Sequence, residues 1–130
     1  GSRRILEYHG SIWRTRCPGC GREREDRRVP LPDPPRCDAC GGMLRPGVVW
    51  FGESLPFDVW RRAEQAARGV QVFLVVGTSA LVYPAAGLAP LARNAGAKLI
   101  EVNLEETPFS EEVDCSLRGP AGELLPQLIA

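Results

Sequence analysis

Two pairs of closely spaced cysteines constrain the fold of this 130-residue chain more than any other feature. Cys17 and Cys20 form one C-x-x-C pair, Cys37 and Cys40 form a second, and residues 21–36 separate the pairs. Each such turn can present two thiolates to one ion, so two turns complete the tetrahedral four-sulfur shell typical of structural zinc. A shell closed by four cysteines leaves no open position for a substrate. The pattern therefore predicts a zinc ion that stabilises the fold and takes no part in catalysis.

The residues around the cysteines agree with tight turns, because glycines follow each pair and prolines in the spacer exclude a continuous helix. Two disulfides are the rival interpretation, which a reducing cytosol disfavours. The N-terminal stretch GSRRILEYHG lacks the apolar segment of a signal peptide, so we expect a cytoplasmic protein. The fifth cysteine, Cys115, is expected to be a small core residue, with a reactive thiol as the alternative.

Composition excludes two classes of partner. The chain is 44% hydrophobic and 25% charged, with a formal net charge of zero. Binding to nucleic acid needs an excess of Lys and Arg, so we expect no direct nucleic-acid partner. No apolar run approaches the roughly 20 residues that span a bilayer, so no membrane partner is expected either.

From Leu55 onward, the pattern predicts alternating helices and strands: helix Pro56–Arg68, strand Val70–Val76, helix Pro84–Asn94, strand Ala97–Asn103, strand Val113–Leu117 and helix Ala121–Ile129. The nearly continuous apolar run VQVFLVV predicts a strand buried on both faces of a parallel sheet. We therefore predict an α/β fold: a partial Rossmann-like, doubly wound parallel sheet with a small four-cysteine zinc-binding module on its N-terminal side.

Ligands of such sheets bind beyond the C-terminal ends of the strands. Gly77-Thr78-Ser79 follows one predicted strand and offers backbone N–H groups and two hydroxyls to a phosphate or ribose. Asn103-Leu104-Glu105 ends the next strand and suits an adenosine ribose hydroxyl. An ordinary strand-to-helix turn without a ligand is the alternative for the first segment.

Several segments occur in the order in which they occur in one enzyme family: EYHG, the two cysteine pairs, LRPGVVWFGESLP, VVGTSALVYPA and EVNLE. On these motifs the chain resembles the sirtuins, NAD-dependent protein-lysine deacylases, from about Glu7 to its end. VVWFGESLP is most similar to the class III branch. The resemblance covers the C-terminal portion of the catalytic domain. The GAG phosphate loop, the Q-N-x-D motif and the Tyr and Arg that select malonyl and succinyl groups have no counterpart in the chain.

The resemblance implies a role for each matching residue. His9 would be the catalytic base, although a lone histidine is otherwise more often a surface or core residue. The four paired cysteines would bind zinc, the GTS segment would contact NAD, the NLE segment would meet the adenosine ribose, and Ala121 would lie beside the adenine. Two segments would hold the substrate peptide: a pairing strand on one side, formed by Val49, Trp50, Phe51, Gly52 and Glu53, and the loop containing Val82 on the other. Core packing is the alternative for Trp50 and Phe51.

These assignments predict two domains. Residues 1–13 and 47–130 would form the C-terminal part of a Rossmann-like NAD-binding deacylase domain, and residues 14–46 a zinc-binding module. The expected enzyme removes acyl groups from lysines of proteins or peptides and releases nicotinamide and O-acyl-ADP-ribose. Its expected cofactors are NAD and Zn²⁺, and a missing N-terminal half is a further expected partner. Two alternatives remain: a non-catalytic, zinc-containing peptide-binding module, and a different nucleotide-binding protein that carries a zinc ribbon.

Overall fold

The computed structural model describes residues 2–128, and the chain divides into two compact units, residues 1–60 and 61–130. Each unit is described by itself. The predicted assignment of residues 1–13 and 47–130 to one domain stays a prediction, because compactness alone does not test it. None of the helices in the described part of the chain is long and apolar enough to cross a membrane.

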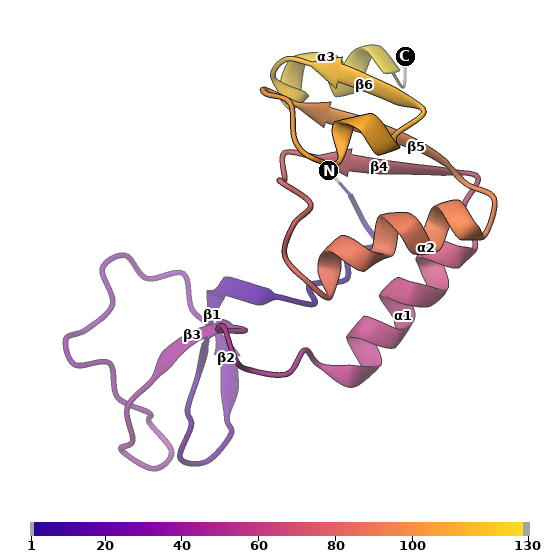
Figure 1. The fold of residues 1–130 in the computed structure, drawn as a ribbon. Helices are drawn as coiled ribbons and strands as arrows, with labels where there is room; N and C mark the ends of the chain where they lie inside the picture. The colour runs from indigo at the N-terminus through magenta and orange to yellow at the C-terminus, as the bar shows by residue number, and fades with distance from the viewer. Residues whose placement is uncertain (1, 129–130) are drawn as a thin grey trace. The chain divides into compact units, whose positions relative to one another are not determined.

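The first unit contains an antiparallel sheet with strand order β2-β1-β3, formed by β1 (Gly10–Arg16), β2 (Glu23–Glu25) and β3 (Arg45–Val48) (Figure 1). The turn that joins β1 to β2 carries the first cysteine pair, and the loop before β3 carries the second. The two pairs therefore stand at the ends of neighbouring strands. Strand β1 also pairs with β3 on its other side, and the register shifts between Ser11 and Thr15. Helix α1 (Phe57–Arg68) begins within one residue of the predicted position.

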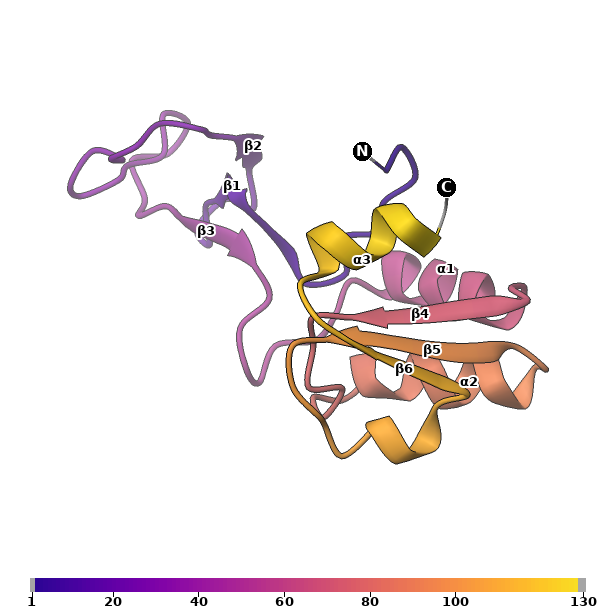
Figure 2. The same ribbon diagram turned by 90° about the horizontal axis from the view of Figure 1, so that it is seen from above.

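The second unit contains a parallel sheet with strand order β4-β5-β6, formed by β4 (Val72–Val76), β5 (Lys98–Asn103) and β6 (Cys115–Arg118). Figure 2 shows α2 (Leu88–Asn94) and α3 (Ala121–Leu128) on opposite sides of these strands. The predicted α/β class with a parallel sheet is confirmed. A 3-10 turn, η1 (Ala85–Gly87), replaces the first turn of the helix predicted from Pro84, and Ile129 of the last predicted helix lies outside the described residues.

Two predictions about burial are wrong. Leu99 and Val102 of the central strand β5 are buried, but Val72 and Leu74 of β4 are 50% and 42% exposed. Val72 and Leu74 lie on the same face of β4, so this face is not covered as the apolar run predicted, and β4 is also an edge strand with a single neighbour. Cys115 was expected in the core and is exposed, because it begins β6 at the opposite edge of the sheet.

Candidate functional site

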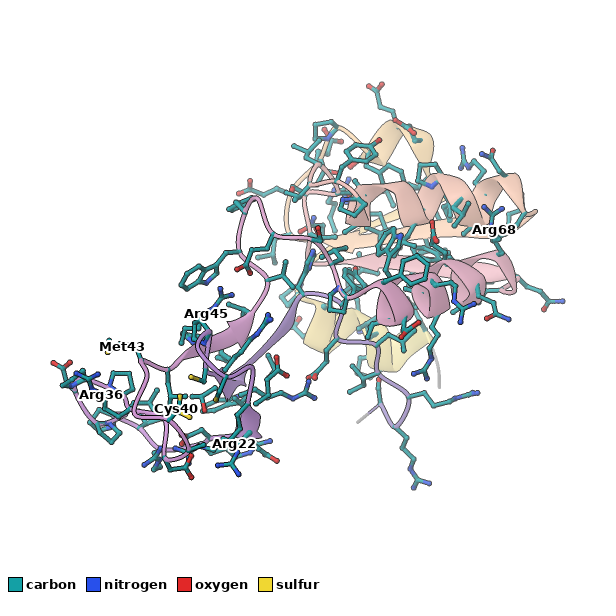
Figure 3. All side chains as sticks on the ribbon, turned by 90° about the horizontal axis from the view of Figure 1, so that it is seen from below. Arg22, Arg36, Cys40, Met43, Arg45 and Arg68 are labelled. Carbon is teal, nitrogen blue, oxygen red and sulfur yellow. The ribbon has the colours of Figure 1, made fainter. Side chains whose placement is uncertain are left out.

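The four paired cysteines form one cluster in the first unit. Their Sγ atoms all lie within 4.8 Å of one another, with 3.5 Å between Cys17 and Cys40 and 3.7 Å between Cys20 and Cys37. A tetrahedral zinc with bonds of about 2.3 Å separates its sulfurs by about 3.8 Å, whereas a disulfide brings them to about 2.0 Å. The sulfurs are free thiols, and their spacing fits one tetrahedral ion. Figure 3 shows sulfur atoms gathered at Cys40.

The two cysteine turns share one hydrogen-bond pattern. In the first turn, the N–H of Gly21 donates to the carbonyl of Cys17; in the second, the N–H of Gly41 donates to the carbonyl of Cys37, both at 2.8 Å. Both glycines have φ near +72°, a conformation that side-chain-bearing residues rarely adopt. A backbone hydrogen bond from Cys20 lowers the pKa of the buried Cys17 thiol to about 7. The two turns are thus equivalent in backbone, but the lowered pKa favours the thiolate, the form that binds a metal, at Cys17, whereas contacts with the neighbouring thiols raise the pKa of Cys40 to about 12.

The first unit also brings His9 beside the predicted peptide segment. Strands β1 and β3 pair Gly10 with Val48, and the N–H of Val49 donates to the carbonyl of His9 at 3.0 Å. The His9 ring is exposed and meets the Tyr8 ring edge-on, with 4.7 Å between centroids. Two segments far apart in the sequence are therefore neighbours.

Residues 49–53 do not form the predicted strand. The strand β3 ends at Val48, and the chain turns at Phe51 and Gly52, where the N–H of Glu53 donates to the carbonyl of Trp50 at 3.0 Å. Gly52 has φ +86°, which breaks the extended conformation. Phe51 is 95% exposed and Trp50 is 52% exposed, so core packing does not account for either residue. The two aromatic residues therefore lie at the surface, directly after the edge strand β3.

In the second unit, the ends of two neighbouring strands meet around a hollow of about 420 Å³, lined by Gly77, Thr78, Ser79 and residues 103–108. The prediction from parallel-strand geometry placed Gly77–Ser79 and Asn103–Glu105 together, and the structure places all six residues on this hollow. Gly77 has φ +61°, and no atom lies within 4 Å of the position its Cβ would take. The space over this turn is open to a ligand.

Asn103 joins the two sides of the hollow. Its Nδ2 donates to the carbonyl of Thr78 at 2.9 Å, and its Oδ1 accepts the N–H of Leu104 at 2.9 Å. Its amide is therefore used within the protein, while the exposed carboxylate of Glu105 lines the hollow. The carbonyl of Asn103 accepts the N–H of Gly119, two residues before Ala121 at the start of α3. Ala121 does not line the hollow itself. Val82 lies in an exposed loop after β4.

The motifs did not identify Glu101 in β5, the one fully buried acidic residue of residues 2–128. Burial raises the pKa of this carboxyl group, but hydrogen bonds outweigh that effect and hold the pKa at about 2. The donors are the hydroxyls of Ser110, Thr107 and Ser116 and the guanidinium of Arg118. A glutamate inside the apolar run KLIEV was the available signal, because buried carboxylates need partners.

Comparisons with known proteins agree with these features. The sequence profile of the Sir2 family matches residues 1–84. An NAD-dependent protein deacylase of Aquifex aeolicus (strain VF5) is 53% identical over 93% of this chain and 51% of the relative. NAD-dependent protein deacylase 2 of Pyrobaculum aerophilum is 48% identical over 99% of this chain and 52% of the relative.

Solved structures extend the likeness to the fold. A Sir2 homologue in complex with NAD superposes with a TM-score of 0.93 at 46% identity, covering 99% of this chain and 51% of that one. A Sir2 structure with a p53 peptide and NAD⁺ gives a TM-score of 0.87 at 32% identity, covering 99% and 55%. The chain spans about half the length of the relatives it matches. Its cysteine cluster, strand-end hollow and sequence identify it as a member of the Sir2 family.

Proposed function

We propose that this chain is the C-terminal part of an NAD-dependent protein-lysine deacylase. The observation that carries the proposal is the strand-end hollow, where the GTS and NLE segments of the family meet around open space. The Sir2 relatives are named NAD-dependent protein deacylases, and solved relatives hold NAD or ADP-ribose. These likenesses cover half of each relative, so the activity is assigned to the protein of which this chain forms a part.

The hollow would hold the adenosine side of NAD. Backbone N–H groups at Thr78 and Ser79 would face phosphate or ribose oxygens, and the carboxylate of Glu105 would accept hydrogen bonds from ribose hydroxyls. Leu104 would supply apolar contact, and Ala121 would lie beside the adenine, through the link between Gly119 and Asn103. When bound, NAD supplies the ribose carbon that receives the acyl oxygen and loses nicotinamide.

His9 would act as the base that removes a proton from a ribose hydroxyl. Its imidazole is exposed and its backbone is fixed to Val49, so the ring is available to a ligand near the 49–53 segment. Histidine is the side chain that enzymes use most often as a general base. Backbone groups at residues 49–53 would hold an extended acyl-lysine peptide with little dependence on its sequence. Free thiols at the cysteine cluster suit a reducing compartment such as the cytoplasm.

The proposal is tested by nicotinamide release from NAD in the presence of acetyl-, succinyl- and malonyl-lysine peptides. The assay uses this chain alone and fused to the complementary part of the Aquifex aeolicus relative. We expect peptide-dependent release in the fusion and a loss of about a thousandfold in His9→Ala, because general base catalysis contributes about 10²–10⁴-fold. Arg68→Ala, a change at the exposed end of α1, is the matched control and should retain activity.

Three outcomes would contradict the proposal or the role it gives to His9. Undiminished turnover in His9→Ala would remove His9 from catalysis. Binding of acyl-lysine peptide without any nicotinamide release in the fusion would instead favour a non-catalytic peptide-binding module. Nucleotide binding that is insensitive to every acyl peptide would favour a different nucleotide-binding protein.

A further inference from the structure

Glu101 is a buried carboxylate that the proposed deacylation chemistry does not use. It lies in the middle of β5, two residues before Asn103, and its side chain has no exposed surface. Its Oε1 accepts the hydroxyl of Thr107 at 2.6 Å. Its Oε2 accepts the hydroxyls of Ser110 at 2.6 Å and Ser116 at 2.9 Å and the guanidinium of Arg118 at 2.9 Å. Four side chains from one loop and one strand therefore converge on a single carboxylate.

The loop that Glu101 binds is the loop that lines the hollow. Residues 104–108 form one side of the hollow, and Thr107 and Ser110 anchor that loop to the core. Ser110 accepts the N–H of Thr107 at 2.8 Å, and the hydroxyl of Thr107 accepts the N–H of Phe109 at 3.2 Å. The hydroxyls that hold the loop backbone are thus the ones that donate to Glu101. Losing the carboxylate would free both hydroxyls to rotate away from it.

Arg118, which lies in β6, binds both Glu101 and Ser110. One of its nitrogens donates to Glu101, and the other donates to the hydroxyl of Ser110 at 2.7 Å. The residue after it, Gly119, donates its N–H to the carbonyl of Asn103 at 3.0 Å. The carboxylate therefore links the 104–110 loop to the segment that leads into α3.

Stability alone does not require a charge at this position, because replacing a buried ion pair with apolar residues of similar volume is often neutral or stabilising. We propose that Glu101 is a positioning residue for nucleotide binding, which holds the 104–110 loop and the entry to α3 in the arrangement that the hollow needs. The proposal rests on the function proposed above, because it takes the hollow as the adenosine site.

A second carboxylate, Asp114 directly before β6, binds the first residues of β5 and provides a control. Asp114 accepts the N–H of Leu99 at 2.8 Å, the amine of Lys98 at 3.0 Å and the guanidinium of Arg93 at 3.3 Å. None of these residues lines the hollow. Asp114→Asn and Glu101→Gln each remove one carboxylate that is hydrogen-bonded to the parallel sheet. If only Glu101→Gln weakens nucleotide binding, the effect depends on where the carboxylate lies and not on a general loss of stability.

The test titrates ADP-ribose into the 130-residue chain and its Glu101→Gln, Ser110→Ala and Asp114→Asn variants, and measures the dissociation constant and the unfolding temperature. We expect the dissociation constant to rise about tenfold in Glu101→Gln and about threefold in Ser110→Ala, as the loss of hydrogen bonds to a charged group predicts. In Asp114→Asn it should stay within about twofold. Equal dissociation constants in Glu101→Gln and the wild type would overturn the proposal, as would equal weakening in Asp114→Asn.

Amide hydrogen exchange separates this proposal from the function on which it rests. If the wild-type chain does not bind ADP-ribose, the assignment of the hollow as an adenosine site fails for this chain. Exchange still tests the positioning role: Glu101→Gln should accelerate exchange at Thr107, Phe109 and Gly119 and leave Leu99 unchanged. Unchanged exchange at those three amides would overturn it.

Discussion

The guanidinium of Arg45 makes several contacts that fix the turn after β3. It forms a two-pronged ion pair with Glu53 and donates to the carbonyl of Val48 at 2.7 Å. It also lies over the Trp50 ring, 3.8 Å from the centroid. Glu53 in turn accepts the N–H of Trp50 at 3.0 Å. Hydrogen bonds from Arg45 and from the Trp50 backbone lower the pKa of Glu53 to about 2, so the pair is charged at neutral pH.

Arg45→Lys should loosen this turn. A lysine keeps the charge but cannot make the forked contact or stack on the indole. We expect exchange of the Trp50 and Glu53 amides to accelerate about tenfold, the change expected when one charge-assisted hydrogen bond is lost. Amide exchange followed by NMR measures this directly. Arg14→Lys, at the exposed ion pair with Glu7, is the control and should leave both amides unchanged; identical exchange in the two variants would contradict the role of Arg45.

At the scale of elements, the two cysteine turns are the structures that join the strands of the first unit. Cys17 and Cys37 are buried together with Leu44, and little other apolar surface surrounds them. Small modules with so little core fold only with a metal or a disulfide in place. We propose that zinc supplies this stability, since the four sulfurs have tetrahedral spacing.

Cys37→Ser should therefore abolish zinc binding, since a hydroxyl is a poor replacement for a thiolate ligand. We expect elemental analysis to find one zinc per wild-type chain and almost none in the variant, with loss of amide protection in β1 and β2. The exposed Cys115 offers the matched control, because Cys115→Ser changes the same atom outside the cluster. A folded wild-type chain without zinc would contradict the assignment.

At the scale of the whole molecule, four carboxylates in both units have lowered pKa values. Hydrogen bonds from Arg28 lower the pKa of Asp26, and the backbone N–H of Leu99 lowers that of Asp114, each to about 2. Glu53 and Glu101 have pKa values of about 2 as well. A carboxylate whose pKa is depressed by folding contributes stability above its unfolded pKa of about 4 and loses it as the pH falls.

The free energy of unfolding should therefore fall steadily between about pH 5 and pH 2. Urea unfolding at several pH values measures the slope. Zinc release in acid contributes to that slope in every variant, so the informative quantity is the difference between the wild type and Asp114→Asn. The variant should be less stable at pH 7 and show a shallower decline; parallel curves would mean that Asp114 contributes nothing through its charge.

Sequence reasoning was most successful where chemistry is local or where one rule of topology applies. C-x-x-C spacing and the glycine after each pair determine the cysteine turns within a few residues. Parallel strands bring their C-terminal ends to one edge, so Gly77–Ser79 and Asn103–Glu105 had to meet once the strands were identified. The burial of individual side chains was predicted less well, because Cys115 and Val72 are apolar but lie exposed on edge strands.

Spacing and periodicity along the chain predict the cysteine turns, the alternation of helices and strands, and the strand ends that form the hollow. The partners of each buried charge, in contrast, follow from tertiary contacts alone. Glu101 receives its donors from residues 107–118, and the turn at Phe51 depends on Arg45, and neither pairing has a signature in the spacing of residues. Such contacts depend on how strands and loops are juxtaposed in space, which local patterns do not specify.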